Sequence, residues 1–226
     1  MRDVDTCNKQ LKERIMYKTI IKRVLDIMGS IMLFPVFLLA LLLFGPIIKL
    51  TDGGPVFYNP KRIGRNGRLF TMLKFRSMYV DSPDIRLSDG STYNGDDDPR
   101  VTKIGRFIRK TSIDELPQII NVLIGNMSFI GPRPDPPDWI EKYPEEIKVF
   151  LTVRPGITGY SQAYYRNSDD GNQKMEHDAY YARHLTFLFD CKILLKTITT
   201  VFRSENTYKD LSGEAEAIKQ AEELKK

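Results

Sequence analysis

The hydrophobic pattern of the chain is uneven, and one stretch, Val24 to Leu50, is apolar at nearly every position. Within it, Ile27 to Ile48 is an uncharged run of about 22 residues, which is long enough to span the hydrocarbon core of a bilayer. Further apolar residues follow the run, where a secretory signal peptide would have a small-residue cleavage site. The pattern therefore predicts a membrane helix.

Two features favour a re-entrant helix over a single transmembrane anchor, although hydropathy alone allows either. Pro35 lies near the middle of the stretch, where it removes a backbone hydrogen bond and can kink the helix. Both flanks are basic, and cytoplasmic flanks collect lysine and arginine. The cations are Lys18, Lys22 and Arg23 before the stretch, and Lys49, Lys61, Arg62, Arg65 and Arg68 after it. If both flanks are cytoplasmic, the helix enters and leaves the membrane by one face.

The other segments are defined by their position around this helix, which we assign to residues 24–50. Residues 1–23 interleave basic and apolar side chains, which is typical of a helix lying on an anionic lipid surface; a solvated tail is the alternative. We expect a catalytic domain over residues 51–205 and a charged, dispensable tail over residues 206–226.

Alternating short apolar runs after the membrane stretch predict a small β-hairpin. Its strands are Val56 to Tyr58 and Leu69 to Phe75, and Asn66-Gly67 supplies the turn. Asp81 to Asp98 is rich in Asp, Ser and Gly and has no periodicity, so we expect a loop there.

Helical periodicity dominates the second half of the chain. Val101 to Ile124 predicts a helix, a break and a second helix, and Trp139 to Val149 predicts a short polar helix. His177 to Phe202 predicts one long helix with an apolar stripe that packs on the core or on the membrane surface. The predicted fold class is α+β, mostly helical: a monotopic membrane protein with a hairpin and membrane-surface amphipathic helices.

Composition narrows the class of protein. The chain has 226 residues, two cysteines, two histidines and a formal net charge of +5. The cysteine and histidine counts exclude a disulfide scaffold, a cysteine-based zinc site and a histidine-rich metal centre. The basic excess suits an anionic membrane, a phosphorylated substrate or a nucleic acid. The mean hydropathy of −0.32 excludes a polytopic membrane protein.

The segment RKTSIDELP, Arg109 to Pro117, is the main candidate for chemistry. Ser112 followed by Glu115 matches a capping box, which places Asp114 and Glu115 at a helix N-terminus. Two carboxylates there can simply oppose the helix dipole. They can also hold Mg²⁺ against phosphate oxygens, and an aspartate can attack phosphorus.

Two arginines support the chemical interpretation. Arg109 and Arg133 are candidate phosphate clamps, because the guanidinium fork matches phosphate oxygens. An acid pair, arginines and an apolar membrane element together indicate phosphoryl transfer onto a lipid.

Long blocks of the sequence resemble the bacterial sugar transferases known as monotopic phosphoglycosyl transferases, or polyprenyl-phosphate hexose-1-phosphate transferases. The blocks are KRVLD (Lys22–Asp26), DGGPVFY (Asp52–Tyr58), RIGRNGRLFTMLKFRSM (Arg62–Met78), DPRVTKIGRFIRKTSIDELPQIINVLIGNMSFIGPRP (Asp98–Pro134), PGITGYSQ (Pro155–Gln162) and DAYYARHLTFLFDCKILLKT (Asp178–Thr197). The additional membrane helices of long family members are missing, so we expect a minimal catalytic form. The family's serine before Pro35 is replaced by Phe34.

The resemblance implies a reaction and a site. Asp114 attacks the β-phosphate of a UDP-sugar and releases UMP, and polyprenyl (undecaprenyl) phosphate then takes the sugar phosphate from the aspartyl intermediate. Asp114 and Glu115 are the implied catalytic and metal-binding residues, with Mg²⁺ as the cofactor. The implied phosphate-binding residues are Arg109, Arg133, Lys74 and Arg76. The implied location is the cytoplasmic face of the bacterial inner membrane, in contact with anionic phospholipid. A homodimer is compatible with the resemblance.

Two other functions remain as alternatives. One is a non-enzymatic, membrane-anchored module that binds lipid phosphate; no motif supports nucleic acid as its ligand. The other is a transferase that moves the sugar alone and releases UDP. The released nucleotide distinguishes this second alternative from phosphoglycosyl transfer.

Overall fold

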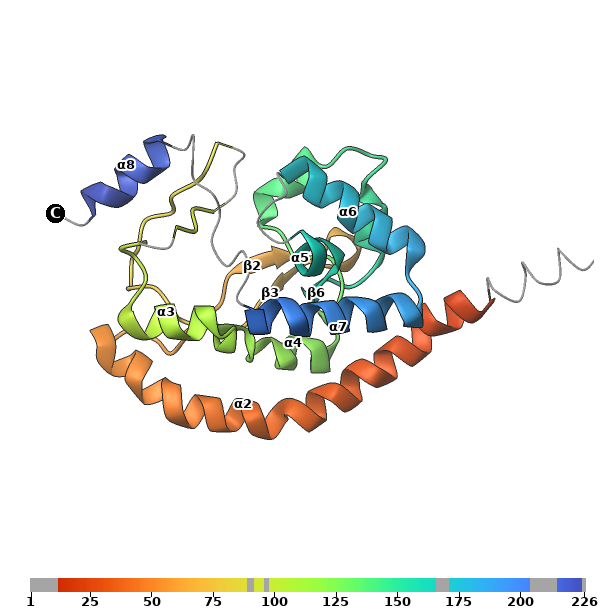
Figure 1. Ribbon diagram of the computed structural model, residues 1–226, viewed down its shortest axis with the longest axis horizontal. Helices are drawn as coiled ribbons and strands as arrows, with labels where there is room; N and C mark the ends of the chain where they lie inside the picture. Colours follow the sequence, from red (N-terminus) through yellow and green to blue (C-terminus); the bar gives the residue numbers. More distant parts are fainter. Residues whose placement is uncertain (1–11, 89–91, 96–97, 166–170, 204–214, 225–226) are drawn as a thin grey trace, which may run out of the picture.

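A long, curved N-terminal helix forms one edge of the molecule. The computed structural model describes residues 12–88, 92–95, 98–165, 171–203 and 215–224, and in it the chain is helical without a break from Lys12 to Asp52. The helix comprises a π-helical turn, η1 (Tyr17–Ile21), and α2 (Lys22–Asp52). Figure 1 shows α2 as an arch with the other elements on its concave side. The helix continues through Pro35 and Pro46.

Short helices and strands make up the body above this arch. The helices are α3 (Lys103–Lys110), α4 (Gln118–Ile124), α5 (Tyr160–Tyr164), α6 (Gly171–His184), α7 (Phe187–Arg203) and α8 (Ala215–Glu223). The 3₁₀ turns are η2 (Arg65–Gly67), η3 (Ile113–Glu115), η4 (Pro137–Lys142) and η5 (Lys148–Thr152). The strands are β1 (Phe57–Tyr58), β2 (Lys61–Ile63), β3 (Leu69–Thr71), β4 (Lys74–Phe75), β5 (Ser128–Ile130) and β6 (Gly156–Thr158). The α+β class, with helices predominating, is confirmed.

The two faces of α2 differ in burial. Phe37, Ala40 and Ile48 are buried in a core that α2 shares with β4, α3 and α4. On the other face, Met32 is 72% exposed and Leu42 is 71% exposed. Only 22% of the most apolar 18-residue stretch of this helix is buried, whereas the core helix of a water-soluble domain is mostly buried. An apolar surface of this length needs a lipid or protein partner.

The first turns of α2 are bonded to the body. Lys22 forms a buried ion pair with Asp190 of α7 at 2.6 Å. Arg23 donates to the carbonyls of Val122 and Leu123, at 2.5 and 2.7 Å, and so caps the C-terminal end of α4. Lys22 and Arg23 therefore serve contacts within the protein, and their charges do not indicate the side of the membrane on which this flank lies.

The predicted hairpin is confirmed. The strands pair antiparallel in two short segments, β1 with β4 and β2 with β3. At the tip, Asn66 and Gly67 have φ of 57° and 73°, the positive values that tight hairpin turns require. A third pair, β5 and β6, is parallel.

Two helix predictions are wrong, and one is confirmed. The break between α3 and α4 is present as predicted. The predicted helix from Trp139 to Val149 is instead two 3₁₀ segments, with Pro144 in the extended turn between them. The predicted long helix ends at His184 and restarts at Phe187, because Thr186 caps the new helix by accepting a hydrogen bond from the Phe189 amide at 3.2 Å.

The loop prediction holds for the described part of residues 81–98, which contain no helix and one isolated bridge. Part of the predicted tail packs on this loop. Ala217 and Ala221 of α8 are buried against Ile85, Leu87 and Tyr93. The rest of the predicted tail and residues 1–11 lie outside the described residues.

Candidate active site

The acid pair lies in the turn between α3 and α4. Asp114 and Glu115 belong to η3, and α4 starts at Gln118 with Pro117 at its N-cap position. The predicted capping box is wrong: Ser112 has a left-handed backbone (φ 57°) and its side chain makes no cap hydrogen bond. The side chain of Glu115 instead forms ion pairs with Lys74 and Arg133.

Cations from two distant segments meet the acid pair. Lys74 of β4 places its Nζ 2.8 Å from Glu115 Oε1 and 3.6 Å from Asp114 Oδ2. Arg133, in the turn after β5, donates from both terminal nitrogens to the same Oε1 at 3.2 Å. The structure thus brings together Lys74, Asp114, Glu115 and Arg133, which were all candidates from the sequence.

The neighbours make the two carboxyl groups electrostatically different. Burial raises the pKa of Asp114 and outweighs the lowering effect of Lys74. For Glu115, burial is overcome by Lys74 and Arg133, which hold its pKa below the ordinary value. Glu115 is therefore the ion-paired carboxylate. The anion of Asp114 is less stabilised, which suits a nucleophile.

Arg109 lies next to this cluster. Its Nε donates to Ser77 Oγ at 2.8 Å, and its charge lowers the pKa of Asp114. Ser77 also accepts, through its carbonyl, a hydrogen bond from the Thr102 amide at the start of α3. Arg109 is thus held within electrostatic range of the acid pair.

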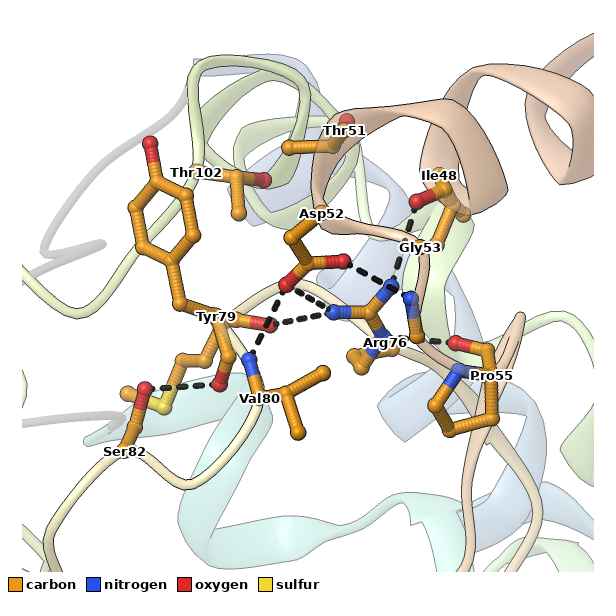
Figure 2. A network of polar contacts seen from close by, with 12 residues as sticks. Ile48, Thr51, Asp52, Gly53, Pro55, Arg76, Tyr79, Val80, Ser82 and Thr102 are labelled. Atoms are coloured by element: carbon orange, nitrogen blue, oxygen red, sulfur yellow. Dashed lines mark hydrogen bonds and ion pairs between the residues drawn. The ribbon is translucent and has the colours of Figure 1, made fainter.

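The structure places Arg76 apart from the acid pair, at the end of α2. Figure 2 shows its guanidinium between Asp52 and the backbone of the neighbouring segments. It pairs with Asp52, and it donates to the carbonyls of Pro55 at 2.6 Å and Ile48 at 3.1 Å. Asp52 also accepts from the Val80 amide at 3.0 Å. In this structure Arg76 fixes the C-terminal end of α2.

Two glycines allow this close approach. Gly53 ends α2 with φ of 76°, a conformation that favours glycine. A Cβ on Gly54 would lie 2.2 Å from Val80 and 2.9 Å from the Arg76 guanidinium carbon. The DGGP motif therefore serves the junction between helix and hairpin.

Asn121 is a positioning residue that the sequence analysis missed. From the buried face of α4 its side-chain oxygen accepts from the Leu73 amide at 2.8 Å, and its nitrogen donates to the Thr71 carbonyl at 2.8 Å. These bonds fix the hairpin next to Lys74. A polar residue in the apolar run IINVLI was the one available signal.

Asp114 and Glu115 are the residues that could hold a magnesium ion, if a substrate supplied further ligands. Mg²⁺ takes one or two carboxylates and completes its shell with water and phosphate oxygens. Asp114 and Glu115 supply two adjacent carboxylates. The described residues contain no cluster of three or more His, Cys, Asp or Glu side chains that could hold a metal without further ligands.

The site thus combines a buried acid pair and flanking cations, on elements that pack against the apolar helix α2. In a comparison with known proteins, the bacterial sugar transferase family model matches residues 17–204, and the chain belongs to this family.

Three relatives illustrate the range of the family. The chain is 39% identical over 205 residues to the undecaprenyl-phosphate galactose phosphotransferase of Salmonella typhimurium, covering 83% of this chain and 42% of the relative. It is 40% identical over 187 residues to the UDP-N-acetylgalactosamine-undecaprenyl-phosphate N-acetylgalactosaminephosphotransferase of Aeromonas hydrophila, covering 80% and 43%. An uncharacterized sugar transferase of Bacillus subtilis, EpsL, is 40% identical over 186 residues, covering 82% and 89%. The chain thus spans less than half the length of the first two relatives.

Proposed function

We propose that this chain transfers a sugar-1-phosphate from a UDP-sugar to polyprenyl (undecaprenyl) phosphate and releases UMP. The single observation that carries the proposal is the contrast within the acid pair: Glu115 is paired with both Lys74 and Arg133, whereas Asp114 has a longer contact of 3.6 Å with Lys74. The relatives from Salmonella and Aeromonas, named for sugar-phosphate transfer to undecaprenyl phosphate, support the same reaction.

In the first half-reaction, a carboxylate oxygen of Asp114 attacks the β-phosphorus of the donor. The bond from this phosphorus to the bridging oxygen breaks, and UMP leaves with that oxygen. The product is an acyl phosphate that links Asp114 to the sugar phosphate. Lys74, Arg109 and Arg133 offset the charge that develops on the phosphate oxygens.

In the second half-reaction, an oxygen of polyprenyl phosphate attacks the same phosphorus and frees the carboxylate of Asp114. The product is a polyprenyl diphosphate sugar. Glu115 keeps Lys74 and Arg133 in place during both halves, since both cations bind its Oε1. A magnesium ion held by Asp114 and Glu115 would neutralise the donor diphosphate and make UMP a better leaving group.

The arrangement of α2 supports a re-entrant, monotopic placement on the cytoplasmic side of the inner membrane, where nucleotide sugars occur. Lys22 and Arg23 tie one end of α2 to α7 and α4, and Asp52 ties the other end to Arg76 in the same body. Single cysteines at Lys12 and at Lys148, labelled in intact cells, test this placement. Labelling of the two positions from opposite sides of the membrane would overturn it.

The reaction is tested by UMP release from a panel of UDP-sugars, with Mg²⁺ and undecaprenyl phosphate, in nanodiscs. We expect UMP from at least one donor with the wild type and a loss of at least about 10³-fold in Asp114→Asn. Asp138→Asn, which removes an exposed carboxylate paired with Lys142, is the matched control and keeps full activity.

The other outcomes separate the alternatives. UDP in place of UMP would show transfer of the sugar alone. UMP release that persists in Asp114→Asn would exclude the aspartyl intermediate. Binding of undecaprenyl phosphate with no nucleotide release from any donor would favour the non-enzymatic module.

A further inference from the structure

Lys174, Asp135 and Asp178 form a second cluster of charged side chains, next to Arg133. The reaction steps proposed above do not use this cluster. Lys174 of α6 places its Nζ 2.9 and 2.8 Å from the two carboxylate oxygens of Asp135, and 3.3 Å from Asp178 Oδ2. Tyr143 donates to Asp135 Oδ2 at 2.9 Å. The cluster connects α6, which lies on the opposite side of the molecule from α2 in Figure 1, to the turn that carries Arg133.

The backbone of this turn is hydrogen-bonded on both sides of Arg133. Before it, the amide of Gly131 and the carbonyl of Pro132 bond to β6, at 2.8 and 2.9 Å. After it, the carbonyl of Asp135 accepts from the amide of Ile63 in the hairpin at 2.9 Å. These hydrogen bonds hold the backbone on both sides of Arg133.

Lys174 adds a contact at Arg133 itself. Its Nζ lies 3.5 Å from the Arg133 carbonyl oxygen, while the Lys174 side chain is only 21% exposed. The Arg133 side chain is 44% exposed, so its guanidinium depends on a fixed backbone for its direction. A guanidinium forms two parallel hydrogen bonds with a phosphate only when it is held in the matching orientation.

Asp135 is also a competing charge for Arg133. Asp135 follows Arg133 by two residues in the same turn, and Lys174 contacts both the Asp135 carboxylate and the Arg133 carbonyl. Without a neutralising partner, this carboxylate would attract the guanidinium and repel an anionic donor.

We propose that Lys174 is a positioning residue for the sugar-phosphate donor: it neutralises Asp135 and holds the turn so that Arg133 stays directed at the acid pair. This inference rests on the proposed function, because it assumes that Arg133 binds the donor diphosphate. Lys174 acts through Arg133 and makes no contact with the reacting atoms.

The test compares the kinetics of UMP release for Lys174→Met, Lys174→Arg and the double variant Lys174→Met/Asp135→Asn. In Lys174→Met we expect kcat/KM for the donor to fall by about 10- to 100-fold, mainly through KM. Lys174→Arg keeps most of the activity because it retains the charge. The double variant recovers at least a third of the loss in log(kcat/KM), because the carboxylate in the Arg133 turn is gone while Asp178, on α6, is unchanged.

Lys148→Met is the matched control, since Lys148 forms an exposed pair with Glu145 and such pairs contribute little. Its kinetics should equal those of the wild type. A double variant as slow as Lys174→Met, with an unchanged thermal midpoint, would overturn the inference, because a direct substrate contact is not restored by removing Asp135. If Lys174→Met does not fold, the comparison of Lys174→Arg with the double variant tests the inference in its place.

A failure of the proposed function can be recognised separately. If the wild type releases no UMP from any donor, that function fails, and hydrogen exchange at the Ile63 amide, which donates to the Asp135 carbonyl in the turn, then decides the inference. We expect faster exchange in the double variant than in the wild type, and wild-type exchange in Lys174→Arg. Equal exchange in all three proteins would overturn the positioning role.

Discussion

Asp114 and Glu115 are adjacent in the chain, but their partners make them chemically different. Lys74 contacts both, at 3.6 Å from Asp114 and 2.8 Å from Glu115. Arg133 contacts Glu115 alone among the pair. Glu115 therefore holds both cations, and under the proposed function Asp114 is the carboxylate that reacts with the substrate.

Replacing Lys74 by methionine tests this division. Asp114 must be ionised to act as a nucleophile, and Lys74 is the largest influence that lowers its pKa against burial. Lys74→Met raises that pKa further, so the acid limb of kcat/KM should move to higher pH. Lys61→Met, an exposed hairpin lysine bonded to Thr71, is the control. A slower enzyme with an unmoved acid limb would mean that Lys74 acts only on the substrate phosphate.

For individual residues, the sequence indicated which ones belong to the candidate site more reliably than it indicated their arrangement in space. Residue chemistry indicated Asp114, Glu115 and Arg133, the resemblance added Lys74, and the structure places these four together. The resemblance also added Arg76, whereas the structure places Arg76 at the end of α2. Asn121 and Lys174 were missed because their partners lie 48 and 39 residues away in the chain, and no local pattern reports such contacts.

Among the elements, the junction of α2 with the hairpin depends on Arg76. Its side chain is 7% exposed and the paired carboxylate of Asp52 is 17% exposed. Arg76→Met leaves Asp52 without its cation and removes the guanidinium donor from the carbonyls of Ile48, Pro55 and Met78, so we expect a loss of about 3 kcal/mol in unfolding free energy. Thermal unfolding in detergent measures it, with the exposed hairpin arginine Arg68→Met as control. Lost activity with an unchanged midpoint would instead support a direct contact with phosphate.

Local patterns predicted the elements well where one signal dominated. The Asn66-Gly67 turn follows from its turn chemistry and is present, and the predicted break before α4 is present as well. The division of the last long helix was missed because its apolar stripe continues through Leu185, while the capping bond of Thr186 interrupts the backbone. Periodicity records which positions are apolar, and it does not record a competing side-chain hydrogen bond.

In the molecule as a whole, α2 is fastened at both ends to the elements that build the site. Arg23 bonds the end of α4, which follows the acid pair, and Asp52 bonds Arg76, two residues after Lys74. An unattached apolar helix in a bilayer can change its tilt or its depth when the thickness of the hydrocarbon layer changes. This helix cannot tilt without pulling on α4 and on the segment that carries Lys74.

Bilayer thickness should therefore affect catalysis. We expect UMP release, measured in vesicles of increasing acyl-chain length, to pass through one maximum. Arg23→Met, which releases one end, should flatten the dependence, whereas Lys61→Met should leave it unchanged. Equal rates at all acyl-chain lengths would show that bilayer thickness does not reach the site through α2.

The bonds of Arg23 and Asp52 would then connect the lipid around the arch with the acid pair. Under the proposed function, a change in the acyl chains of the membrane would change the rate of sugar-phosphate transfer through the protein's own anchor.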